Sequence, residues 1–217
     1  MMKNLIKKEL CFSALPLTYY FILFACMTMI PGYPILVGAF FVCMGIFQTF
    51  QSAREQNDIL YTVLMPVRKK DAVTARYFFV MLIQMIFFLI CVLLTVIRMQ
   101  FLAQEVVYQK NAMMNANPAY LGYVLIIFTA FNVIFVNGFW KNAYTIGKPF
   151  LRFSIAAFLI IGLTETLHHI PGLMFLNSAG QGMYIQMMIL LASVLGYSLL
   201  SWNCLTASQR NFEKTDL

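Results

Sequence analysis

The chain has 217 residues, of which 61% are hydrophobic and only 11% are charged, and its mean hydropathy is +0.78. Soluble domains carry about 25% charged residues, so this composition excludes a soluble core and indicates a chain embedded in a lipid bilayer. The net charge of +7 does not point to nucleic acid, because the basic residues lie at the ends of apolar segments, as topology signals do.

Residues 1–12 have the period of an amphipathic helix, with an apolar face that Glu9 interrupts. Such a helix lies in the membrane surface, although a generic basic flank before a first span fits the same residues. The apolar run that follows is longer than a signal-peptide core and lacks a small-x-small cleavage site, so we expect an uncleaved span. The apolar face consists of Met2, Leu5, Ile6, Leu10 and Phe12, and Lys3, Lys7 and Lys8 fall outside it.

The first two spans are expected at 15–30 and 35–50. They form a hairpin, because the Pro31-Gly32-Tyr33-Pro34 turn leaves room only for a tight connection. Mainly small and polar residues recur on one face of the second span, which suits close helix packing better than a transport path. The residues of this face are Gly38, Phe41, Gly45, Gln48 and Ser52.

The longest polar interruption covers 51–76, and a third span is expected at 77–97. One stripe of this span carries polar residues, and polar residues at membrane depth usually face the protein interior. The stripe either lines a substrate route or joins helices through hydrogen bonds. Its members are Gln84, Phe88, Cys91, Thr95 and Arg98.

The second half of the chain predicts three further spans, at 119–140, 149–167 and 182–204. Asn132 is the most central polar residue of the fourth span and needs a hydrogen-bonding partner. Residues 99–118 form a polar external segment, 170–180 form an irregular or re-entrant element, and the tail after 204 is polar. The expected fold is therefore an all-α integral membrane protein, with six transmembrane helices in a single transmembrane domain, 1–217.

The distribution of basic residues predicts the orientation. Of the fifteen Lys and Arg residues, only Arg98 and Lys110 fall on the outer side when both termini are placed in the cytoplasm. The thirteen others lie on the inner side, three of them in the loop that holds Lys141, Lys148 and Arg152. This bias agrees with the positive-inside rule, and it places the 51–76 loop in the cytoplasm.

No motif for catalysis or cofactor binding is found. The sequence lacks a GxxxxGK[ST] phosphate loop, a GxSxG elbow and an HExxH helix, so we predict that the chain is not an enzyme and that energy comes from a partner or a gradient. Glu165 and His168, with His169 adjacent, have a spacing that suits a metal, but solvated outer-loop residues explain them better. The five cysteines show no ligand spacing, and no metal site is predicted.

The 51–76 loop contains a predicted short helix at 53–65. Its apolar face combines Ile59, Leu60, Val63 and Leu64, and its first turns are polar. Pro66 ends it, because proline fixes φ and lacks a donor N–H. Basic residues that simply anchor the inner leaflet would explain Arg68 and its two lysine neighbours. They leave the amphipathic half upstream unexplained.

A family resemblance appears at the end of this loop. The stretch LMPVRKKDAVTARY, 64–77, resembles the signature LP-(I/V)-(S/T)-R-x-x-(I/V)-V-x-(S/A)-K-Y of small bacterial permeases in the type-two ABC exporter family, including the permeases of phenol-soluble-modulin exporters. Arg76 stands where the family usually has lysine. The stretch Leu5-Ile6-Lys7-Lys8-Glu9-Leu10 similarly resembles the amphipathic start of the family.

The resemblance implies a permease that pairs with a second copy or a paralogue. Two separate ATPase subunits, which hold the ATP and Mg²⁺, would bind from the cytoplasm, and this chain would hold no cofactor itself. The 53–65 segment would act as the coupling helix between spans two and three. The residues expected to couple to the ATPase are Arg54, Glu55, Asp58, Ile59, Leu60, Tyr61, Leu64, Pro66 and Arg68.

The resemblance further implies export of a hydrophobic or amphipathic substrate, such as a peptide, an antibiotic or a lipid, across a bacterial cytoplasmic membrane. Two alternatives remain open: a substrate-binding membrane subunit of an importer, and a non-transporting immunity or sensor protein. A possible substrate path would include Gln48, Gln84, Thr95, Arg98 and Asn132.

Overall fold

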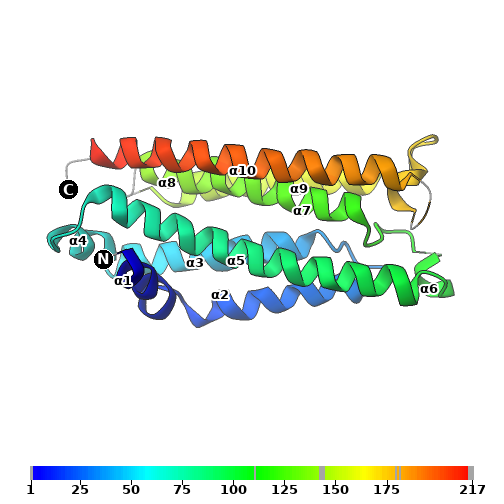
Figure 1. The fold of residues 1–217 in the computed structure, drawn as a ribbon, viewed down its shortest axis with the longest axis horizontal. Coiled ribbons are helices and arrows are strands. Elements are labelled where there is room, and N and C mark those ends of the chain that lie inside the picture. The colour runs from blue at the N-terminus through cyan, green and yellow to red at the C-terminus, as the bar shows by residue number, and fades with distance from the viewer. Residues whose placement is uncertain (1, 110, 142–144, 179, 181, 215–217) are drawn as a thin grey trace.

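The computed structural model describes residues 2–109, 111–141, 145–178, 180 and 182–214. Every regular element in these residues is helical, and the long helices lie side by side in one elongated bundle (Figure 1), so the all-α prediction is confirmed. The helices that run along the bundle are α2 (Pro16–Tyr20) continued by η2 (Phe21–Met29), α3 (Val37–Glu55), α5 (Lys69–Ile97) continued by η3 (Arg98–Leu102), α7 (Pro118–Ala130) continued by η4 (Phe131–Val136) and α8 (Asn137–Lys141), α9 (Gly147–Leu167), and α10 (Met183–Glu213).

The short helices mark the two ends of the bundle (Figure 1). At one end lie α1 (Met2–Lys8), η1 (Glu9–Ser13) and α4 (Asp58–Leu64), and α10 finishes there as well. We call this the α4 end. At the opposite end, the α6 end, lie α6 (Val106–Gln109) and η5 (Met174–Asn177). The irregular element predicted at 170–180 is therefore a set of turns around η5.

Several helices suit a membrane interior. Within the described residues, four helical stretches are long and apolar enough to cross a bilayer, and the pair Met2–Ser13 and Pro16–Met29, bent by 91°, is a fifth candidate. α3 is not among them, because its last turns carry Gln48, Gln51, Arg54 and Glu55. The four stretches are Lys69–Leu102, Pro118–Lys141, Gly147–Leu167 and Met183–Glu213.

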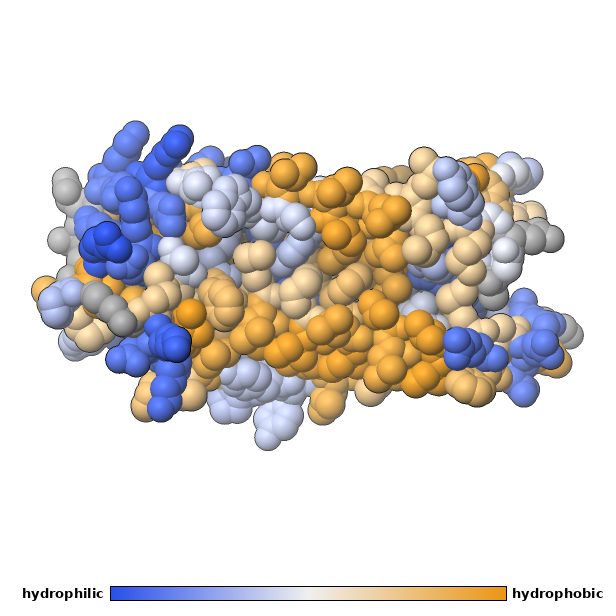
Figure 2. Space-filling model, viewed as in Figure 1, coloured by the Kyte–Doolittle hydropathy of each residue, from blue (hydrophilic) through white to orange (hydrophobic). Residues whose placement is uncertain are grey.

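The outer surface agrees with this assignment. Large apolar side chains such as Leu159, Leu195 and Trp202 are more than 60% exposed on α9 and α10. In Figure 2, apolar residues form a broad belt across the middle of the visible face, and hydrophilic residues collect at the two ends. A bundle with this surface hides its apolar belt from water only when lipid surrounds it.

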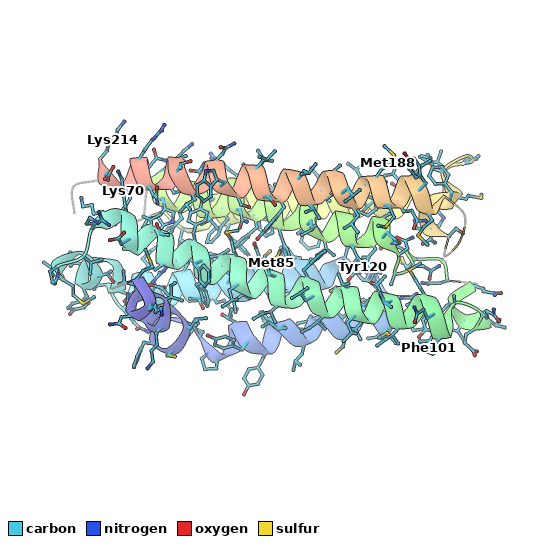
Figure 3. The ribbon with its side chains drawn as sticks, viewed as in Figure 1. Lys70, Met85, Phe101, Tyr120, Met188 and Lys214 are labelled. Carbon is cyan, nitrogen blue, oxygen red and sulfur yellow. The ribbon has the colours of Figure 1, made fainter. Side chains whose placement is uncertain are left out.

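Two helices extend beyond the predicted spans. The third long helix begins at Lys69 rather than at 77, and the last continues to Glu213 rather than to 204. Charged and polar residues can extend a membrane helix into water, since its backbone hydrogen bonds remain internal. The two extensions lie side by side at the α4 end, where Lys70 pairs with Glu213 at 3.1 Å (Figure 3).

The small-residue face predicted on the second span packs against the first. A Cβ on Gly45 would lie 2.7 Å from the Phe21 ring, and a Cβ on Gly38 would lie 2.9 Å from the Phe24 carbonyl oxygen. The Thr18 hydroxyl donates to the Gly45 carbonyl oxygen at 2.7 Å. The packing interpretation is confirmed for both glycines, which let α3 approach α2 and η2 closely.

Candidate functional site

α4 is a separate helix that projects from the end of the bundle. α3 continues through Glu55, and Asn57 then takes a left-handed conformation, with φ 54°, that starts the new helix at Asp58. Asparagine adopts this conformation more readily than other non-glycine residues. The predicted helix at 53–65 is therefore too long: Arg54 and Glu55 belong to the last turn of α3, because nothing in the sequence breaks α3 before Asn57.

The connection between α4 and α5 is short and extended. Met65 is extended before Pro66, as residues before proline usually are, and Arg68 is the extended residue that precedes α5. The loop between α3 and α5, including α4, therefore covers 56–68. Arg68 is exposed and pairs with Asp71 at 3.0 Å, an arrangement that stabilises the first turn of α5 by only a fraction of a kcal/mol.

The outward side of α4 is apolar. Leu60, Tyr61 and Leu64 are 44%, 66% and 74% exposed, and Met65 just beyond them is also exposed. The side chains of Ile59 and Val63, predicted for the same face, lie outside the described part of the chain. Apolar side chains gathered on a projecting helix at a polar end of the bundle are typical of a docking surface.

The inward side of α4 is held by a charge cluster, which we define as Lys8, Glu9, Asp58 and Arg76. The Arg76 guanidinium is 2% exposed and donates to both Glu9 carboxylate oxygens, at 2.7 and 3.1 Å. It also donates to Asp58 at 2.6 Å. Lys8 approaches the second Asp58 oxygen at 2.6 Å. The cluster therefore joins α1 and η1 to α4 and α5.

Further contacts complete the cluster. The Lys8 ammonium donates to the Thr62 hydroxyl on α4 at 2.7 Å, and the Ser13 hydroxyl donates to Asp58 at 3.4 Å. The Arg76 guanidinium lies over the Phe50 ring, 5.4 Å from its centroid, which adds a contact with α3. Four segments of the chain thus meet at one arginine.

Charges control the ionisation of Asp58. Burial alone raises the pKa of its carboxyl, but the charges of Arg76 and Lys8 and their hydrogen bonds outweigh burial, and the pKa lies below its usual value of 3.8. A carboxyl with a lowered pKa in the folded protein contributes stability at pH values above 3.8. That contribution is lost as the pH falls through the lowered pKa. The attachment of α4 therefore persists across the physiological range.

Sequence reasoning missed three members of this cluster, Lys8, Glu9 and Arg76. It treated Glu9 as an interruption of an apolar face and Arg76 as a substitute for a family lysine. The signal was present, because a carboxylate on an apolar helical face requires a partner. The partner could not be identified, because Glu9 and Arg76 lie 67 positions apart.

Two of the predicted path residues meet inside the bundle. The Gln84 and Asn132 side-chain amides exchange two hydrogen bonds of 3.1 Å each, and both residues are fully buried. Tyr197 donates to Gln84 at 2.8 Å, and Asn132 donates to Ser201 at 3.0 Å. These bonds join α5, η4 and α10, so the partner expected for Asn132 is found. Their geometry is that of an interhelical joint.

The other predicted path residues lie apart from this joint. Arg98 is 3% exposed towards the α6 end, where it donates to the Thr28 carbonyl oxygen at 2.6 Å and to Asn115 at 2.7 Å. Its guanidinium also lies 4.4 Å from the Tyr108 ring centroid. Gln48 and Thr95 each have a buried side-chain oxygen without a hydrogen-bonding partner in the described residues. A path through the five residues stays a prediction.

The Glu165 and His168 side chains contact a loop at the α6 end. Glu165 accepts a hydrogen bond from the Met114 backbone N–H at 2.9 Å, and the His168 Nε2 lies 3.3 Å from the Ala112 carbonyl oxygen. Among the described residues, no group of three or more His, Cys, Asp or Glu side chains is arranged to hold a metal. Both residues thus pack the 111–114 segment against the end of α9.

Comparison with known proteins identifies the family. The model for the ABC-2 family transporter proteins matches residues 3–212, which is nearly the whole chain. Proteins of this family are membrane components that are generally not catalytic and that work with an ABC ATPase. Searches of curated proteins and of solved structures found no match. With its apolar helices and this match, the chain belongs to the ABC-2 transporter family as a multi-pass membrane protein.

Proposed function

We propose that the chain is the permease subunit of an ATP-driven exporter, and that α4 is the helix through which the ATPase drives it. One observation carries this proposal: α4 exposes Leu60, Tyr61 and Leu64 on one side, while charged and polar groups fix its other side to three neighbouring segments. A docking helix needs both properties. It must offer apolar surface to a partner, and it must pass on the partner's movement.

Arg76 is the proposed point of transmission. It lies near the start of the 29-residue helix α5, and the same guanidinium binds Asp58 of α4 and Glu9 of η1. Movement of α4 would therefore shift α5 and the N-terminal helices together. Two ATPase subunits, holding ATP and Mg²⁺, would close during the cycle and push on α4, and α5 would carry the displacement into the bundle.

The proposed topology has six spans with both termini in the cytoplasm. It adds α3 and the α2–η2 segment to the four apolar helices, since both lie along the bundle beside them (Figure 1). The polar end of α3 then lies at the cytoplasmic surface together with α4. α1 and η1, which turn sharply away from α2, would lie in the inner membrane surface of a bacterial cell.

The proposed substrate is hydrophobic or amphipathic, and the complex contains a second permease copy or paralogue. The apolar interior, interrupted by amide and hydroxyl groups, supports a substrate with few charges. The path through Gln48, Gln84, Thr95, Arg98 and Asn132 stays a prediction. A substrate that moved along this path would have to break the hydrogen bonds between Gln84 and Asn132, because both side chains are fully buried.

Co-purification tests the ATPase assignment. The tagged chain is purified from its native cells in mild detergent, and the ABC ATPase that co-purifies is quantified by mass spectrometry. The pair Leu60→Asp and Leu64→Asp should lower ATPase recovery at least tenfold, because losing two apolar anchors at an interface costs about 2 to 4 kcal/mol.

The matched control changes two similar residues at the opposite end. Val106 and Val107 are 59% and 60% exposed on the short helix α6, and Val106→Asp with Val107→Asp should leave ATPase recovery unchanged. Full recovery of the ATPase with the folded α4 variant would show that α4 is not the docking helix. Equal loss in both variants would point to general misfolding, which size-exclusion chromatography would reveal.

A further inference from the structure

A surface depression follows the helix formed by α7, η4 and α8. It consists of two cavities, one of about 480 Å³ between α8 and α9 and one of about 530 Å³ between α7 and α10. Val133 and Ile134 on η4 line both, so the two cavities are adjacent, and we refer to them together as the groove. The first cavity lies towards the α4 end, and the second extends from it towards the middle of the bundle.

The cavity near the α4 end is basic. Lys141 at the end of α8 and Lys148 and Arg152 at the start of α9 line it, together with the polar Asn137. Lys148 and Arg152 are four positions apart and therefore share one face of α9. No Asp or Glu belongs to the described lining, and none of the three cations has an ion-pair partner within the described part of the chain. Among the residues that the structure describes, three positive charges thus converge on one cavity without an acidic partner.

The second cavity is apolar and open. Ile126 and Ala130 form its floor, and Ile189, Gly196 and Leu200 form its wall on α10. From Ile126 to Asn137 the helix rises by about 16 Å, which is close to half of the roughly 30 Å hydrocarbon core of a bilayer. The groove therefore has the length of one lipid leaflet, with its cations at the headgroup end.

We propose that this groove binds one anionic phospholipid. The phosphate lies among Lys141, Lys148 and Arg152, and one acyl chain lies along Val133, Ile134 and the apolar wall of α10. Basic cavities between helices at the cytoplasmic side of a membrane are suited to anionic headgroups. A free phosphate ion would account for the cations alone, whereas a phospholipid accounts for the cations and the apolar continuation together.

Binding of this lipid is independent of ATPase docking, because the groove and α4 share no lining residue. Only the leaflet depends on the proposed topology: with the termini in the cytoplasm, it is the inner one. The bound lipid would connect α9, through Lys148 and Arg152, to α8 and η4 in the middle of the bundle.

Native mass spectrometry tests the headgroup site. The full-length protein is released from micelles that contain equal amounts of phosphatidylglycerol and phosphatidylcholine, and the ratio of the two one-lipid complexes is measured. The triple variant with Lys141→Gln, Lys148→Gln and Arg152→Gln should have a lower preference for phosphatidylglycerol. The expected decrease is at most about fivefold for each charge removed. The control variant carries Lys3→Gln, Lys7→Gln and Arg210→Gln, which remove three exposed charges outside the cavity. Its preference should stay at the wild-type value.

A second pair of variants tests the acyl-chain site. A Cβ added at Gly196 or at Gly162 meets no atom within 4 Å, so phenylalanine fits at either position without an immediate clash. Gly196→Phe fills the groove and should reduce the bound phosphatidylglycerol severalfold, whereas Gly162→Phe, outside the groove, should not. Excess inorganic phosphate should leave the bound lipid in place.

Three outcomes would overturn the proposal. An equal loss in the control charge variant would mean that general surface charge attracts the lipid. An unchanged complex in Gly196→Phe, or displacement of the lipid by inorganic phosphate, would mean that the cavity takes only a phosphate group. In every groove variant the ATPase should still co-purify, so failure here and failure of α4 docking can be distinguished.

Discussion

Arg76 shows how a single residue can organise one end of a membrane bundle. Moving its charge out of water is costly, and the cost is offset only because two carboxylates accept three of its hydrogen bonds. Replacing such a buried pair can be tolerated when both partners change. Removing one partner alone leaves a buried charge unpaired, which typically costs about 3 to 5 kcal/mol.

A double-mutant cycle between Glu9 and Arg76 measures this coupling. We expect Glu9→Gln and Arg76→Met each to lower the free energy of unfolding by about 3 kcal/mol, and the double variant to lose about 2 kcal/mol less than the sum. SDS titration of the solubilised protein gives these energies. The contribution of Asp58 to the cluster should be the same at pH 7 and pH 5, because its pKa lies below the usual value of 3.8.

The exposed pair Arg68 and Asp71 is the natural control for this cycle. Its members are three residues apart, and the arginine side chain is 84% exposed. A cycle with Arg68→Gln and Asp71→Asn should give a coupling energy below about 1 kcal/mol. A coupling energy for Glu9 and Arg76 as small as that of this pair would contradict the structural role assigned to the buried cluster.

At the scale of the element, α4 is defined by its two boundaries rather than by its own sequence. It has only seven residues, too few for an isolated helix to be stable in water. Asn57 sets the direction of the helix at its first boundary. The extended Met65 before Pro66 ends the helix at the second boundary. The charge cluster then supplies the tertiary contacts that keep the helix formed.

The left-handed conformation of Asn57 leads to a prediction about α4. Asn57→Gly should preserve the junction, since glycine adopts positive φ freely, whereas Asn57→Val should strain it by about 1 to 2 kcal/mol. Asn57 is exposed, so no packing is lost in either variant. Limited trypsin digestion at Arg54 and Arg68, which flank α4, should be several times faster for the valine variant. Equal rates for the two variants would show that the conformation at this position does not determine how α4 is held.

At the scale of the molecule, the periodicity of apolar residues predicted the long helices well. Each expected span lies within a helical segment or exceeds one by no more than two residues. Runs of about 20 apolar residues have few alternatives to a membrane helix. The ends were less predictable. Lys69 and Glu213 belong to helices that continue beyond their apolar runs, and hydropathy carries no signal for such extensions.

Contacts between distant segments could not be predicted. Asn132 was expected to need a partner, yet Gln84, Tyr197 and Ser201 could be assigned to the network around it only once the helices were placed together. The charge cluster could not be predicted either, because its members lie on separate helices whose packing the sequence does not give. A sequence indicates which polar groups need partners, and the packing of the helices decides which partners they receive.

The six-span topology makes a prediction for the whole chain. In a cysteine-free background, single cysteines at Glu55 and Glu105, which are both exposed, should react differently with a membrane-impermeant maleimide on intact cells. Glu105→Cys, at the α6 end, should react at once, because that end faces outward in the proposed topology. Glu55→Cys, beside α4, should react only after the cells are permeabilised. Labelling of Glu55→Cys on intact cells would reverse the orientation and would place α4 where no cytoplasmic ATPase can reach it.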